Sequence, residues 1–187
     1  MRCSQARVSL LIAGALGWAV RPAAAQGEPG HVIMVAPRLP PAAFSELSPG
    51  IRSELERRHC MIPQVAGDTT RHNVLRGRFR RPGQMDWAVL CWVNGYSSIL
   101  VFWHGTPSQH PGEVAVATDA EYTEPLDSGR VTFVRAIAVM DSAHIPEPQS
   151  VAITHDGIRS IHRGKSSLAY YWDEGEEKWI PLVGTDP

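Results

Sequence analysis

Residues 87–104, WAVLCWVNGYSSILVFWH, decide the fold of this 187-residue chain. Two apolar runs flank the pair Asn94-Gly95, which favours the tight turn of a β-hairpin because both residues tolerate positive φ. The expected opposite pairs are Trp87 with Phe102, Cys91 with Ser98 and Val93 with Tyr96. Both faces of the run 87–93 are apolar, so we expect this hairpin to be the buried centre of a sheet.

Short apolar runs continue on the C-terminal side of the hairpin and just before it. From residue 73 onward, runs rich in Val, Ile, Trp and Tyr alternate with Gly, Pro, Asn and Asp, which is typical of β-strands. Besides the hairpin, the expected strands are 73–79, 113–118, 131–140, 151–154, 159–163, 168–172 and 179–183. The sequence therefore predicts a mainly β fold: a single antiparallel-sheet domain, built as a sandwich or as a partial propeller-like sheet.

One short helix is expected before these strands, near the N-terminus of the domain. Ser48 can cap it, Pro49 suits its first turn, and Ile51 and Leu55 fall on one face. We expect the helix to end near Arg58. The other elements expected in this part are a weaker helical turn over 42–47 and one strand within 31–36.

The first 25 residues have the pattern of a secretory signal peptide. Arg2 and Arg7 precede an apolar run of about 13 residues, shorter than the roughly 20 that a membrane-spanning helix needs. Small residues at 23–25 supply a cleavage site before Gln26. We therefore expect residues 26–187 to form one exported domain, periplasmic or secreted, with no membrane anchor after cleavage.

The charge balance of the expected mature chain is mildly acidic. Removal of residues 1–25 leaves 15 basic against 19 acidic side chains, a net charge of −4 with histidines neutral. This balance gives no general affinity for nucleic acid or for an anionic membrane surface.

Two cysteines, Cys60 and Cys91, remain after the expected cleavage. In an oxidising compartment such a pair favours a disulfide, because two thiolates alone do not complete a zinc site. The alternative is two buried, unpaired thiols that pack as small apolar side chains.

Four arginines form a candidate binding surface. Arg76, Arg78 and Arg80 alternate with apolar residues in the expected strand 73–79, and Arg81 follows, which predicts a positive stripe on one face. One interpretation is pairing with the chain's own acids. These acids are Asp173, Glu174, Glu176 and Glu177. The other interpretation is an anionic partner, an acidic protein surface or polysaccharide, held by forked arginine contacts.

Candidate catalytic residues are His155, Asp156 and His162, since imidazole and carboxylate groups can form an acid/base or metal site. The alternative is an ordinary turn at 155–157. The sequence contains no nucleophile elbow, phosphate-binding loop or dinucleotide fingerprint. It therefore favours a non-catalytic binding or envelope-associated protein without metal or cofactor, and leaves a small metal-assisted hydrolase as the alternative.

Aromatic residues are numerous and have two interpretations. Trp87, Trp92, Trp103, Trp172 and Trp179 can belong to the core, as is usual in β proteins, or form a stacking platform for sugars or a partner. The acidic run between the last two tryptophans is typical of a solvated hairpin tip.

Residues 77–89, GRFRRPGQMDWAV, resemble the FG-GAP repeat of integrin-type β-propellers in their length and in the placement of Gly, Phe, Gly, Asp and Ala-Val. In that family the segment is a strand, a calcium-binding loop and a strand. Here Arg78, Arg80 and Pro82 stand at ligand positions and only Asp86 of the acidic set remains. The resemblance therefore implies the backbone shape without calcium. The chain shows one copy, whereas a propeller needs at least about four blades.

Overall fold

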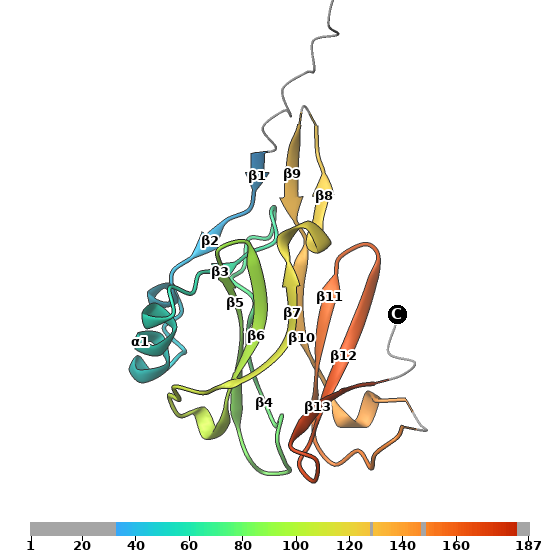
Figure 1. Cartoon of the computed structure of the whole chain (residues 1–187). Helices are drawn as coiled ribbons and strands as arrows, with labels where there is room; N and C mark the ends of the chain where they lie inside the picture. The colour runs from blue at the N-terminus through green and yellow to red at the C-terminus, as the bar shows by residue number, and fades with distance from the viewer. Residues whose placement is uncertain (1–32, 128, 147–148, 183–187) are drawn as a thin grey trace, which may run out of the picture. The chain divides into compact units, whose positions relative to one another are not determined.

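The computed structural model describes residues 33–127, 129–146 and 149–182 (Figure 1). Strands make up 44% of the structure, and the described residues contain four sheets and one α-helix, so the predicted mainly β fold with one helix is confirmed. The expected signal peptide at 1–25 and the expected new N-terminus, Gln26, lie outside the described residues.

Two four-stranded antiparallel sheets form the body of the fold. The central sheet contains, in spatial order, β4 (Val74–Gly77), β5 (Asp86–Val93), β6 (Tyr96–Phe102) and β7 (Gly112–Thr118). The C-terminal sheet contains β10 (Arg135–Met140), β11 (Gly157–His162), β12 (Ser166–Asp173) and β13 (Lys178–Pro181).

The remaining elements are short. A three-stranded sheet contains β1 (Ile33–Val35), β9 (Arg130–Phe133) and β8 (Thr123–Pro125), with β1 parallel to β9. A two-stranded sheet pairs β2 (Arg38–Leu39) with β3 (Ile62–Pro63). The helix is α1 (Pro49–Arg57), and the 3-10 turns are η1 (Pro41–Ala43), η2 (Trp103–Gly105), η3 (Asp119–Tyr122) and η4 (Ser142–His144).

The β5–β6 hairpin has the predicted register. The three expected opposite pairs, Trp87 with Phe102, Cys91 with Ser98 and Val93 with Tyr96, are all present. Both strands lie in the middle of the central sheet and are largely buried, as the apolar character of both faces predicts.

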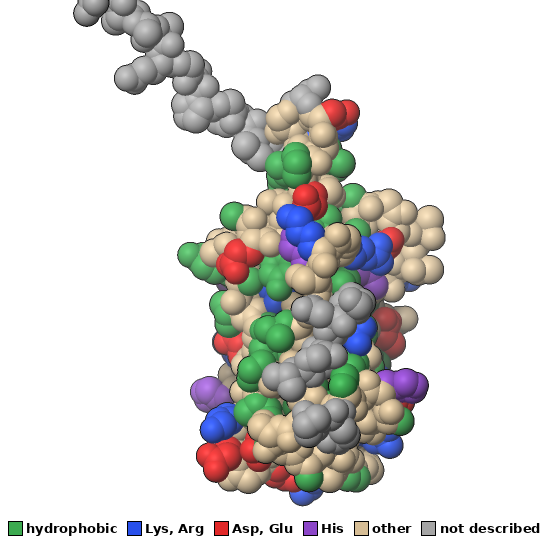
Figure 2. Space-filling model, turned by 90° about the vertical axis from the view of Figure 1, so that its right-hand side faces the viewer, with side chains coloured by type: hydrophobic (Ala, Val, Ile, Leu, Met, Phe, Trp, Pro, Cys, Tyr) green, Lys and Arg blue, Asp and Glu red, His purple; other side chains and the backbone are tan. Residues whose placement is uncertain are grey.

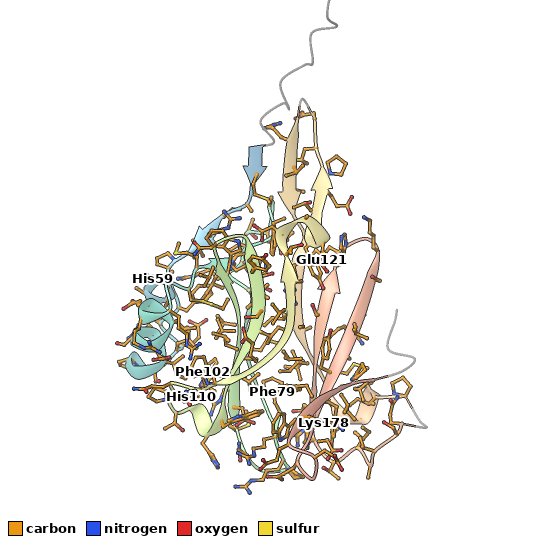
Figure 3. All side chains as sticks on the ribbon, viewed as in Figure 1. His59, Phe79, Phe102, His110, Glu121 and Lys178 are labelled. Carbon is orange, nitrogen blue, oxygen red and sulfur yellow. A yellow bond between two sulfur atoms is a disulfide. The ribbon has the colours of Figure 1, made fainter. Side chains whose placement is uncertain are left out.

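Each face of the central sheet packs against a different core. On one face, Val89, Leu100 and Phe102 pack with Ile51 and Leu55 of α1. The second core lies on the opposite face. It contains Ala88, Leu90, Ile99 and Val101 of the central sheet, with Phe79, Ile137 and Ile158. Figure 3 shows Phe102 on the side of α1 and Phe79 on the side of the C-terminal sheet. The two large sheets therefore share a core, which corresponds to the sandwich alternative.

A disulfide joins Cys60, just after α1, to Cys91 at the centre of β5, with a Cα–Cα distance of 5.3 Å. The predicted bridge is thus present, and it fits an extracellular or periplasmic location. The helix begins as predicted, because the Ser48 hydroxyl accepts a hydrogen bond from the Ile51 amide. In the described ranges, no helix has the length and apolar character needed to cross a membrane.

Three expected strands differ from the structure. The run 131–140 is two strands, because Val134 donates its amide to Tyr122 and accepts from the Arg163 amide, and the chain changes sheets there. Residues 151–154 form no strand, and the Thr154 amide donates to the Tyr171 hydroxyl. The strand expected over 73–79 ends at Gly77, so Arg78 and Arg80 lie in a loop.

Buried polar side chains join the sheets. Asn73, fully buried with φ of 69°, donates to the carbonyls of Pro63 and Arg135 and accepts from the Ile137 amide. Arg135 is also fully buried, and its guanidinium donates to the Ser97 carbonyl at 2.7 Å and to the Ser160 hydroxyl at 3.2 Å. Burial lowers the pKa of Arg135.

Candidate functional site

An open cleft of about 300 Å³ brings together three segments that are distant in sequence. They are residues 80–82 of the loop between β4 and β5, residues of the stretch 151–155, and residues 171–175 at the end of β12. Lys178, labelled in Figure 3, marks the start of β13 just beyond this turn. We call this site the arginine–tryptophan cleft.

The loop that carries Arg80 is held by one buried carboxylate. Asp86 is fully buried, and its Oδ2 accepts hydrogen bonds from the amides of Phe79 and Arg80, both at 3.1 Å. Its Oδ1 accepts from the Gln84 side chain at 2.6 Å and from the His104 amide at 2.8 Å. Asp86 therefore acts as the hydrogen-bonding centre of the loop, and its oxygens are occupied by N–H donors.

The predicted arginine stripe is divided between two carboxylates of the chain. Arg78 makes a forked contact with Asp156, with Nη2–Oδ1 at 3.0 Å and Nε–Oδ2 at 3.2 Å. Arg80 Nε donates to Glu174 Oε1 at 3.2 Å, and Arg81 Nη1 lies 3.8 Å from the same oxygen. Pairing with the acids around residue 174 was one of the two interpretations of the sequence; the contact with Asp156 was not anticipated.

Arg76, the fourth arginine of the stripe, remains on β4. Its guanidinium lies 5.9 Å from the ring centre of Trp87, the residue opposite it in the register of β4 and β5. It does not line the cleft.

Burial of Asp156 by itself would raise its pKa. The hydrogen bonds from the Arg78 side chain and from the amides of Arg78 and Ser142 outweigh that effect, so the pKa lies below its ordinary value. Asp156 is therefore held as a carboxylate that anchors the segment before β11 to the loop after β4.

Three tryptophans pack together beside the cleft. Trp172 lies opposite Trp179 in the register of β12 and β13, and their ring centres are 5.4 Å apart. Trp103 of η2 contacts both, at 5.1 Å and 5.8 Å. The Arg80 guanidinium lies 5.7 Å from the Trp103 ring centre. Trp172 also lines the cleft and is partly exposed, so a rigid aromatic surface borders the arginines.

His155 forms the inner wall of the cleft. It is buried, and its ring stacks on Tyr171 with centroids 4.1 Å apart and planes 7° from parallel. Burial lowers the pKa of His155 below its ordinary value, against the smaller opposing effect of hydrogen bonds to backbone groups. The imidazole therefore supports the wall as a neutral ring.

The structure does not bring the three candidate catalytic residues together. His155 precedes β11 and His162 ends it, which separates them by roughly 17 Å of extended strand. His162 lies 3.4 Å from Glu124 and stacks on Tyr122. Among the described residues no group of three or more His, Cys, Asp or Glu side chains is placed to hold a metal ion.

Figure 2 shows Lys and Arg side chains beside Asp and Glu side chains over much of one face of the molecule. The cleft lining offers guanidinium N–H donors, carboxylate acceptors and a tryptophan surface. This is the combination of an apolar surface with a few polar groups that orients a bound ligand.

No family model, curated protein or solved structure matches the chain. The resemblance of residues 77–89 to an FG-GAP repeat stays a prediction, and the segment comprises the end of β4, a loop and the start of β5.

Proposed function

We propose that this protein is an exported, non-catalytic binding protein that holds its ligand in the arginine–tryptophan cleft. The observation that supports this proposal is the convergence of Arg80 and Arg81 with Trp172 and Glu174 around one open cleft. The signal-peptide pattern of residues 1–25 supports export, and the Cys60–Cys91 disulfide fits it.

The contacts of the arginines bear on the kind of partner. An anionic partner was expected to bind Arg76, Arg78, Arg80 and Arg81. Three of these already lie within 4 Å of a carboxylate of the same chain. An acidic protein or polysaccharide would have to compete with these carboxylates, so the cleft as a whole, rather than the positive stripe, is the better candidate.

The hydrolase alternative has less support. His155 is stacked on Tyr171, and Asp156 is bound by Arg78, so both side chains are engaged in holding the fold. His162 lies at the other end of β11. These placements favour binding over catalysis for the residues that line the cleft.

Hydrogen–deuterium exchange tests the proposal directly. The exported protein is mixed with polysaccharide and protein fractions of the cell envelope, and backbone exchange is followed by mass spectrometry. We expect slower exchange in residues 78–85 and 171–177 with at least one fraction, and unchanged exchange in α1. Protection confined to other segments, or none with any fraction, would overturn the proposal.

Export has its own test. The intact mass of the exported protein should match a chain that begins at Gln26. A mass that includes residues 1–25 would contradict export by cleavage.

A further inference from the structure

We propose that the arginine–tryptophan cleft binds an uncharged saccharide ring, an inference that rests on the proposed binding function. Three features of the cleft carry it: its charges are already balanced, its free polar groups match neighbouring hydroxyls, and its aromatic surface is held rigid.

The charges of the cleft balance within the chain. Two cations, Arg80 and Arg81, and two carboxylates, Asp173 and Glu174, line it. Glu174 Oε1 is shared by both arginines, at 3.2 Å and 3.8 Å. A carboxylate or phosphate ligand would have to displace Glu174 and would meet repulsion from Asp173. An uncharged ligand leaves the pairs intact.

The remaining polar groups suit hydroxyls. Arg80 binds Glu174 through Nε, and its terminal nitrogens make no hydrogen bond to the described residues. Both arginine contacts of Glu174 use Oε1, which leaves Oε2 for a ligand. A hydroxyl donates one hydrogen bond and accepts others, so adjacent hydroxyls of a sugar can accept from the guanidinium and donate to the carboxylate together.

The aromatic surface is pre-positioned. Trp172 is fixed by ring contacts with Trp103 and Trp179 at 5.1 Å and 5.4 Å, yet it is partly exposed in the cleft. The negative face of an indole attracts the slightly positive C–H groups on one side of a sugar ring. Because the indole is already held in place, little conformational entropy is lost on binding.

The size of the cleft limits the ligand. Its volume of about 300 Å³ lies at the small end of the range for ligand pockets. The cleft is open to solvent, so a longer chain can continue outward while one or two rings of a glycan contact the cleft.

The experiment measures binding of the exported protein to immobilised uncharged oligosaccharides, acidic oligosaccharides and polyglutamate. We expect uncharged oligosaccharides to bind, with an affinity that salt changes little because no net charge is neutralised. Glu174→Gln should weaken this binding about tenfold, since the neutral amide oxygen accepts a hydrogen bond more weakly than the carboxylate does. Glu176→Gln is the matched control, because Glu176 belongs to the same turn, is exposed and does not line the cleft.

Folding of the variants is checked by thermal melting. Glu174 is 43% exposed, so its replacement should leave the fold intact. Trp172→Phe provides a second variant that keeps an aromatic ring, and it should also weaken binding of the uncharged oligosaccharides while Glu176→Gln leaves it unchanged.

The possible outcomes separate the two proposals. Binding restricted to acidic oligosaccharides or polyglutamate, and strengthened in Glu174→Gln because the competing carboxylate is gone, overturns the uncharged class of saccharide and leaves the binding function standing. Uncharged oligosaccharides that bind both variants as well as the wild type overturn the assignment to this cleft. If no probe binds, the saccharide proposal is wrong, and exchange protection by envelope fractions then decides the binding function separately.

Discussion

The β5–β6 hairpin and the arginine–tryptophan cleft are held in different ways. In the hairpin, neighbouring strands bury apolar side chains on both faces, and a two-residue turn sets the register. Around the cleft, polar contacts join segments distant in sequence: Arg78 with Asp156 outside its lining and Arg80 with Glu174 within it, pairs that are 78 and 94 residues apart. Stability and the proposed binding site therefore depend on largely separate side chains, except where a buried polar residue serves both.

Asp86 is that exception, and its replacement should have the largest effect on stability of the changes considered below. Asp86→Ala should lower the free energy of unfolding by about 4 kcal/mol, because four N–H donors lose a buried charged acceptor. Urea denaturation measures this change. Asp127→Ala, at an exposed carboxylate, is the control and should change stability by less than about 0.5 kcal/mol. A loss below about 1 kcal/mol for Asp86→Ala would show that the loop keeps its conformation without the Asp86 carboxylate.

The disulfide should contribute slightly less to the free energy of unfolding than Asp86 does. Replacing both Cys60 and Cys91 by alanine should lower the free energy of unfolding by roughly 3 kcal/mol, since the bridge closes a loop with a sequence separation of 31. Guanidinium denaturation with and without reductant provides the measurement. The free energy of unfolding of the reduced wild type should match that of the double variant. A wild type whose stability does not change with reductant would contradict the bridge.

The arginines of the stripe should differ from one another. Arg78→Ala should cost roughly 2 kcal/mol, because it leaves the buried Asp156 carboxylate without its forked partner. Arg81→Ala should change stability by less than about 0.5 kcal/mol, since its contact with Glu174 is long and exposed. Equal changes in melting temperature for the two variants would contradict the distinction between Arg78, which anchors a buried carboxylate, and Arg81, which lines the cleft.

Acid should weaken the α1 side of the molecule. Hydrogen bonds from Arg57, opposed by burial and aided by Arg58, lower the pKa of Glu54 from 4.5 to about 2. The stabilisation by this carboxylate is complete above the unfolded pKa of 4.5 and is lost as pH falls from 4.5 toward about 2. Glu54→Gln should thus be less stable than wild type at pH near 6, with the difference shrinking across that range. Denaturation curves in which the difference stays constant with pH would contradict this assignment.

Calcium should have the smallest effect. The loop carries Arg78, Arg80 and Pro82 at the ligand positions of the repeat it resembles, and the Asp86 oxygens already accept four hydrogen bonds. Millimolar calcium should leave the melting temperature unchanged. A marked rise, absent with magnesium, would show that the loop binds the ion.

The hairpin could be predicted from the sequence because its determinants are adjacent along the chain: an Asn-Gly turn between two apolar runs fixes register and burial together. The cap at Ser48 and the disulfide follow from equally local or compartment-based rules. The break at Val134 could not be anticipated, since the run 131–140 is rich in strand-forming residues on both sides of Arg135 while the strand changes partners.

The cleft was only partly foreseen. The sequence identified Arg80, Arg81 and the acids near residue 174 as possible partners, and the structure pairs them. The contribution of Trp103 beside Trp172 depends on how η2 meets β12, which periodicity does not reveal. His155 and His162 looked related because they are close in sequence, but an intervening strand separates them.

The buried pair of Asn73 and Arg135 carries an evolutionary consequence. Apolar core positions tolerate exchanges among side chains of similar volume, so they can drift as a lineage diverges. The amide of Asn73 both donates to and accepts from backbone groups in a left-handed conformation, and Arg135 joins the two sheets through several donors at once. Remote descendants of this fold should therefore retain an asparagine and an arginine about 62 positions apart after the similarity of the rest of the chain has faded.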